Sequence, residues 1–199
     1  MDADAVELRV LGCLVEKQRT TPDAYPLSLN SLRLACNQAT NRDPVVEYDE
    51  PMIREALHQL SRRGWVRLAS GSGSRAVKHR HLFDEALGLS DAEVSLLAVL
   101  MLRGAQTPGE LKQRTERLHR FESPAELESV LHGLIQRELV AKLPRRPGQK
   151  EQRYTQLLGG GEAEDAPQVS PHLAGDSLEA RVERLEAEVR ELREALDRS

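Results

Sequence analysis

The sequence repeats one pattern of helices and strands, and this internal repeat limits the possible folds of the chain more than any other feature. Thr107-Pro108 repeats Thr21-Pro22, and Ser123-Pro124 takes the place of Glu50-Pro51. Residues 130–134 and 139–142 then correspond to residues 56–60 and 65–68. We therefore expect two copies of one small module in the 199 residues, rather than a single large domain.

The first copy has the pattern of three helices followed by a hairpin. Apolar residues at helical spacing predict a helix over 5–17, and Ser28 is a typical cap for a second helix that continues to about residue 38. Asp49 caps a third helix, which ends at Arg62-Arg63-Gly64. Two strands, 65–69 and 75–81, follow, with a glycine- and serine-rich turn between them. This order is typical of a winged helix.

The second copy shows the same order. Helices are expected from Ser90 to Gly104, over residues 109–117 and from Ser123, and strands over 139–142 and 152–158. The predicted fold is mainly α, of the α+β winged-helix class. The predicted organisation is a first winged-helix domain at 1–82, a second at 83–158, a flexible acidic linker at 159–176 and a coiled-coil helix at 177–199.

The C-terminal segment has a heptad pattern. Its apolar residues are spaced alternately four and three apart, and they are Leu178, Val182, Leu185, Val189, Leu192 and Leu196. The two valines fall at a positions, and Leu178, Leu185 and Leu192 fall at d positions, which favours a parallel two-stranded coil. We expect a homodimer through this helix. The alternative is an amphipathic helix that folds back on its own chain, since about three heptads are only marginally stable alone.

Several motifs resemble one bacterial family. They are Leu11-Gly12-Cys13-Leu14-Val15-Glu16-Lys17-Gln18, Ala35-Cys36-Asn37-Gln38, Asn41-Arg42-Asp43-Pro44 and Leu102-Arg103-Gly104-Ala105-Gln106-Thr107-Pro108. In these motifs the chain resembles the YceH family of uncharacterised bacterial proteins, also called domain of unknown function 480, over about residues 5–158. The resemblance implies tandem winged helices and leaves the biochemical role open.

No motif indicates an enzyme or a cofactor. The segment 71–76 fits a nucleotide-binding glycine pattern, but a strand rather than a helix is expected after it. His79 and His81 alternate on a strand without a third metal ligand nearby, and Cys13 and Cys36 lie in apolar helical patterns typical of buried thiols. We expect a protein with no metal and no cofactor.

The acidic N-terminus lacks the features of a signal peptide, so a cytoplasmic location is expected.

The distribution of charge points to duplex DNA. Residues 62–81 contain no acidic residue, whereas residues 162–199 carry 11 acidic and 5 basic side chains. Basic wings suit phosphate contacts, and the third helix of a winged helix reads bases in the major groove. The predicted DNA contacts are Arg54, His58, Gln59, Arg62, Arg63, Arg75, Lys78 and Arg80 in the first copy, with Arg145, Arg146 and Lys150 in the second wing.

The third helix of the second copy is less suited to DNA. Its expected exposed residues are Glu126, Glu128, Ser129, His132 and Gln136. Because the glutamates would repel phosphates, this copy is expected to contact a protein instead. The first hypothesis for the whole chain is a DNA-binding protein that acts as a transcriptional regulator, and it rests on the first copy. The alternative hypothesis is an adaptor that binds other proteins.

Overall fold

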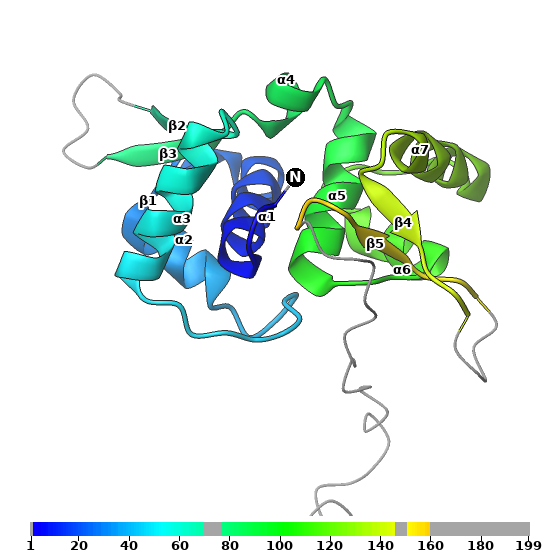
Figure 1. Cartoon of the computed structure of the whole chain (residues 1–199), viewed down its shortest axis with the longest axis horizontal. Coiled ribbons are helices and arrows are strands. Elements are labelled where there is room, and N and C mark those ends of the chain that lie inside the picture. Colours follow the sequence, from blue (N-terminus) through cyan, green and yellow to red (C-terminus); the bar gives the residue numbers. More distant parts are fainter. Residues whose placement is uncertain (1, 70–76, 146–150, 160–199) are drawn as a thin grey trace, which may run out of the picture. The chain divides into compact units, whose positions relative to one another are not determined.

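The computed structural model describes residues 2–69, 77–145 and 151–159, and the statements below concern this part of the chain. It is a mainly helical α+β structure with two small antiparallel sheets (Figure 1). The first copy contains α1 (Ala5–Thr20), η1 (Pro22–Ala24), β1 (Leu27–Ser28), α2 (Leu29–Cys36), α3 (Glu50–Arg62), β2 (Val66–Ala69) and β3 (Lys78–His81). The second contains α4 (Phe83–Leu87), α5 (Asp91–Arg103), α6 (Pro108–Thr115), α7 (Pro124–Gln136), β4 (Val140–Lys142) and β5 (Tyr154–Gln156).

The helices begin where their capping residues predict. Ser28 and Asp49 each accept a backbone hydrogen bond at the start of α2 and α3, from Ser31 at 3.2 Å and from Met52 at 2.9 Å. Ser90 caps α5 in the same way and forms a reciprocal capping box with Glu93. Each such cap contributes about 1 kcal/mol. Every helix and strand expected in the described residues is present, within a few residues of its predicted bounds.

Besides the three-residue η1, two elements were not predicted. Strand β1 is two residues long and pairs with β3, which gives a three-stranded sheet of order β1-β3-β2. Helix α4 is five residues long and follows directly after the expected domain boundary at residue 82. Both are too short to show a period in the sequence, and both form because of partners elsewhere in the chain. Leu27 lies opposite His79, and the Phe83 ring packs on Trp65 with 5.2 Å between centroids.

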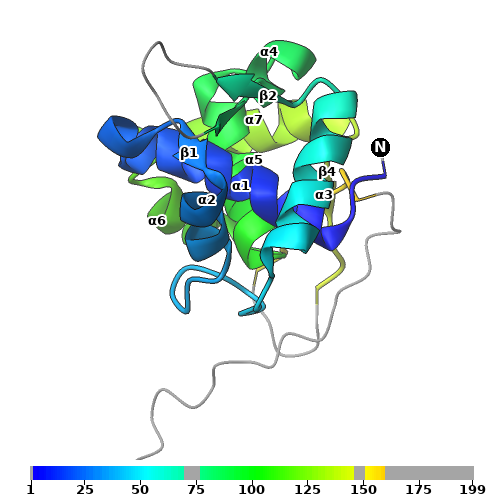
Figure 2. The same cartoon turned by 90° about the vertical axis from the view of Figure 1, so that its left-hand side faces the viewer.

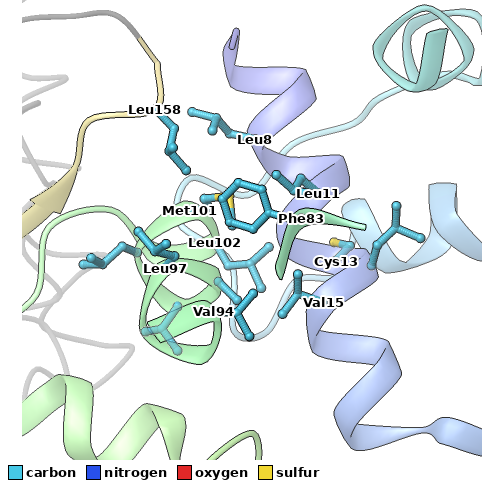
Figure 3. Packing of buried hydrophobic residues seen from close by; sticks show 14 of the residues in the cluster. Leu8, Leu11, Cys13, Val15, Phe83, Val94, Leu97, Met101, Leu102 and Leu158 are labelled. Atoms are coloured by element: carbon cyan, nitrogen blue, oxygen red, sulfur yellow. The ribbon is translucent and has the colours of Figure 1, made fainter. Parts of the chain in front are cut away.

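Helices α1 and α5 form the centre of the described structure and pack against each other (Figure 2). Each is buried around most of its circumference, as expected for a helix inside a core. Figure 3 shows Leu11 and Val15 of α1 in the same cluster as Val94 and Leu102 of α5. The two copies therefore share one hydrophobic core.

The contact between these helices depends on Gly12. A Cβ atom at this position would lie 2.9 Å from Leu102 Cγ and 3.3 Å from Met101 Cβ. We expect Gly12→Ala to lower the free energy of unfolding by about 1–3 kcal/mol, because the side chains around it are already close-packed. Gly133 in α7 is the matched control, since a Cβ there meets nothing within 4 Å. Gly133→Ala should stabilise the protein by up to about 1 kcal/mol through helix propensity. Urea denaturation of both variants measures the difference, and a Gly12→Ala variant as stable as Gly133→Ala would contradict the packing argument.

Among the described residues, no helix is both long enough and apolar enough to cross a membrane. The expected linker after Gly159 and the heptad positions from Leu178 to Leu196 lie outside the described residues. So do the predicted DNA contacts Arg75, Arg146 and Lys150.

Candidate nucleic-acid interface

Helix α3 has one buried face and one polar face. Ile53, Ala56, Leu57 and Leu60 are buried in the core. On the opposite face Arg54, His58 and Arg62 are exposed, and Gln59 is half-buried. The helical period places these four side chains where the sequence predicted them, on a helix held firmly by its apolar side.

Contacts along this polar face leave most of its hydrogen-bonding groups open. Gln59 Nε2 donates to Glu55 Oε1 at 2.6 Å, and His58 Nδ1 lies 3.9 Å from the same carboxylate oxygen. Among the described residues, the hydrogen bond of Arg62 Nη1 is a long one of 3.5 Å, to Gln59 Oε1. Within the described residues Arg54 makes no hydrogen bond or ion pair. Both guanidinium groups can therefore donate to another molecule.

The register between β2 and β3 decides on which face of the hairpin each basic residue lies. Val66 lies opposite His81, Arg67 opposite Arg80 and Leu68 opposite His79. Because successive strand residues point to opposite faces, Lys78 and Arg80 lie on the other face from His79. Arg67 and Arg80 are thus like charges placed side by side on the hairpin. Arg67 is not among the DNA contacts predicted from the sequence.

Two of the predicted DNA-contact residues, Arg63 and Arg80, already interact with other groups of the protein. Arg63 Nη2 donates to the backbone oxygen of Asp2 at 2.8 Å, its Nε lies 3.4 Å from Glu7 Oε1, and its guanidinium lies over the Trp65 ring. Arg80 forms an ion pair of 2.7 Å with Glu85. Both cations are therefore partly neutralised, whereas Arg54, Arg62, Arg67 and Lys78 have no acidic partner among the described residues. The sequence could not separate these groups, because each acidic partner comes from another element.

A largely apolar hollow of about 340 Å³ lies between α3 and the hairpin. It is lined by Leu57 and His58 of α3 and by Val66, Leu68, Val77 and His79 of the hairpin, among others. Leu68 is 61% exposed and Val77 is 64% exposed. Burial, together with the charge of Arg54, lowers the pKa of His79 and so favours the neutral form of its ring. The hollow was not predicted, since it forms only when helix and hairpin come together.

The corresponding surface of the second copy is acidic, as expected. Glu128, Ser129, His132 and Gln136 are exposed on α7. Glu126 is half-buried and lies 3.9 Å from His119. In the second hairpin Arg145 is exposed, and Lys142 lies 5.9 Å from the centre of the Tyr154 ring. The two copies thus present different charges from equivalent helices.

Comparison with known proteins identifies the family. Residues 3–149 match the family described as "Protein of unknown function, DUF480". A UPF0502 protein of Cronobacter sakazakii (strain ATCC BAA-894) is 48% identical over 203 residues, which covers 97% of this chain and 94% of the relative. The chain belongs to the DUF480 family. The resemblance found in the motifs is therefore confirmed, and these descriptions assign no activity.

The two histidines of β3 have different surroundings in this DUF480 protein. His81 is buried, with Nε2 hydrogen-bonded to Gln18 Oε1 at 2.6 Å and its backbone N–H donating to the Tyr25 hydroxyl at 2.8 Å. Burial lowers the pKa of His81, although Asp84 lies 3.4 Å from Nδ1. Within the described residues no cluster of three His, Cys, Asp or Glu side chains could hold a metal ion. The geometry gives His81 a packing role.

The cysteines are buried, as predicted, and they lie side by side. Cys13 and Cys36 are both free thiols inside the core of the first copy. The hydrogen bond with Cys13, together with burial, raises the pKa of Cys36. A thiol with a raised pKa is a poor nucleophile. These residues fill the contact between α1 and α2.

Proposed function

We propose that this DUF480 chain is a non-enzymatic DNA-binding protein built from two winged helices, residues 1–82 and 83–158, and that it acts as a transcriptional regulator. The observation that carries the proposal is the polar face of α3, where Arg54, His58, Gln59 and Arg62 lie on a helix followed by an antiparallel hairpin. A helix fits the major groove of B-DNA, where arginine pairs with guanine and glutamine with adenine. We propose no cofactor.

In this proposal the residues beside α3 contact the DNA backbone. Lys78 and Arg67 have no acidic partner among the described residues, so their charge is available to phosphates. Arg63 would mainly hold α1 in place through Glu7, and Arg80 would mainly hold the hairpin in place through Glu85. Arg145 of the second copy would add a further phosphate contact. Arg75, Arg146 and Lys150 keep the same proposed role on sequence grounds.

The double variant Arg54→Gln/Arg62→Gln tests this proposal. We expect it to weaken binding to random-sequence duplex DNA by at least about tenfold at low salt, because it removes two cations from the helix face that meets the DNA, and binding without sequence preference depends on such charges. Lys112→Gln/Arg120→Gln removes the same charge near α6 and should change the affinity by less than about twofold. Fluorescence anisotropy over a range of salt concentrations measures both. The proposal fails if the wild type does not bind at low salt, or if the two double variants lose affinity equally.

A protein-binding adaptor is the second candidate, and the apolar hollow beside α3 favours it. Leu68 and Val77 expose aliphatic surface that a DNA contact does not require, and α7 presents glutamates. Exposed apolar grooves of this kind are common protein-binding sites. If Leu68→Asp/Val77→Asp abolishes a purified protein complex but leaves DNA affinity unchanged, the adaptor function is supported.

We propose that the heptad segment pairs two copies of this chain. Leu178, Val182, Leu185, Val189, Leu192 and Leu196 would form the seam, with Arg181 facing Glu186 of the second copy. Deleting residues 176–199 is expected to halve the molar mass in solution, measured by light scattering after size exclusion. An unchanged mass would reject pairing through this helix and leave the fold-back alternative.

A further inference from the structure

A second hollow, of about 680 Å³, lies where the first copy meets the second. Helix α1 and the segment after α2 line one side, and α5 and α6 with the residues after it line the other. Its surface is mainly polar and contains a concentration of cations. These are Lys17, Arg103, Arg114 and Arg117. None of these residues belongs to the proposed DNA contacts on α3 and the hairpin.

Glu16 is the carboxylate that lines this hollow, and it already forms an ion pair with the buried Arg42. Glu16 accepts hydrogen bonds from the buried Arg42, at 3.0 Å from Nη1 and 2.6 Å from Nη2. Lys17 Nζ lies farther away, at 3.5 Å from Glu16 and 3.5 Å from Gln38 Oε1. Glu16 therefore mainly offsets the charge of Arg42 and compensates the cations at the opening only in part.

The arginines of the second copy are also only partly paired. Arg114 has one acidic neighbour, Glu110, at 3.3 Å. Arg103 donates to the side-chain oxygen of Asn41 and has no acidic partner among the described residues. Burial lowers the pKa of Arg103, and the like charges of Arg114 and Arg42 lower it further. Arg117 is exposed and makes no ion pair in the described part of the chain. The hollow thus has an excess of positive charge in a partly buried setting.

We propose that this hollow binds a small phosphorylated anion. Guanidinium groups match the geometry of phosphate oxygens and bind them through charge-assisted hydrogen bonds. The volume is that of a typical small-molecule site. Thr20, Asn41 and Gln113 offer neutral polar groups around the cations, and Val99 and Leu102 form an apolar floor for the rest of the ligand. Because both copies line the site, a bound ligand would stabilise their contact.

Inorganic triphosphate is the probe for this site. Titration calorimetry of the full chain at about 50 mM salt should detect binding of one triphosphate per chain, and the complex should unfold at a higher temperature than the free protein. Arg103→Gln/Arg117→Gln is expected to weaken binding by at least about tenfold. Arg117→Gln alone serves as a second variant, since this exposed side chain makes no ion pair with the described residues, and it should weaken binding about threefold or more.

The matched control is Lys112→Gln/Arg120→Gln, which removes two cations from the same helical region outside the hollow. It should retain triphosphate affinity within about twofold. Absence of triphosphate binding by the wild type overturns the proposal, as does equal weakening by the control. If triphosphate does not bind but Arg103→Gln/Arg117→Gln weakens binding to duplex DNA, the hollow is part of a DNA surface and the small-molecule site is rejected.

Discussion

Replacing Arg42 with methionine is expected to lower the free energy of unfolding by about 3–5 kcal/mol, because it leaves a charged partner without its counterion in a partly buried setting. The Arg42 side chain is fully buried, and the Glu16 side chain is 13% exposed. Arg42 Nε also donates to the backbone oxygen of Ala35 at 3.1 Å. The substitution therefore removes both hydrogen bonds that Arg42 donates to Glu16, which leaves Lys17 at 3.5 Å as the nearby cation, and it also removes the bond to the Ala35 carbonyl. Urea denaturation followed by circular dichroism measures the loss.

A double-mutant cycle separates this ion pair from a general packing effect. In Arg42→Met/Glu16→Leu both charges are absent, so the double variant should be more stable than Arg42→Met alone by at least about 1 kcal/mol. If the two substitutions are simply additive, the ion pair is not the reason for the loss. An Arg42→Met variant as stable as the wild type would contradict the role of the bridge altogether.

Phe83→Ala is expected to destabilise the protein by about 3–5 kcal/mol, which is the usual range for removing a buried aromatic ring. The side chain has no exposed surface, and its ring meets Trp65 edge to face at an interplanar angle of 69°. Figure 3 shows the ring in the same hydrophobic cluster as Leu11 of α1 and Met101 of α5. Its removal would leave a cavity where the elements of both copies meet. Thermal and urea denaturation provide the measurement.

Two further variants calibrate the Phe83 result. Phe83→Leu keeps much of the volume and should cost clearly less than alanine. Val77→Ala removes an aliphatic side chain that is 64% exposed, and it should change stability by less than about 0.5 kcal/mol. If Phe83→Ala were no more destabilising than Val77→Ala, α4 would not be anchored by its ring.

The predictable parts of the fold are those with strong local signals. Ser28, Asp49 and Ser90 cap helices because their side chains accept from backbone N–H groups within the next turn, a contact that depends on adjacent residues only. The exposed face of α3 follows in the same way from the helical period. Helix α4 and strand β1 carry no such signal, since each is shorter than the periods by which helices and strands are recognised.

The candidate site was predictable only in part. Arg54, His58 and Arg62 are exposed where the sequence placed them. The sequence could not show that Arg63 contacts Glu7 or that Arg80 contacts Glu85, because those pairings depend on how α1 and α4 pack beside the hairpin. The roles of Arg75, Arg146 and Lys150 stay predictions, as they lie outside the described residues.

The sequence alone determined the repeated order of helices and strands, the helix starts and the family, because these depend on neighbouring residues and on motifs that lie in one stretch. Only the tertiary structure decided that α1 and α5 share one core and that a cation-rich hollow opens beside them. Lys17, Arg103 and Arg117 are far apart in the chain and meet there only through packing. Charges that gather through long-range contacts have no local signal, and for this reason the hollow could be found only in the folded protein.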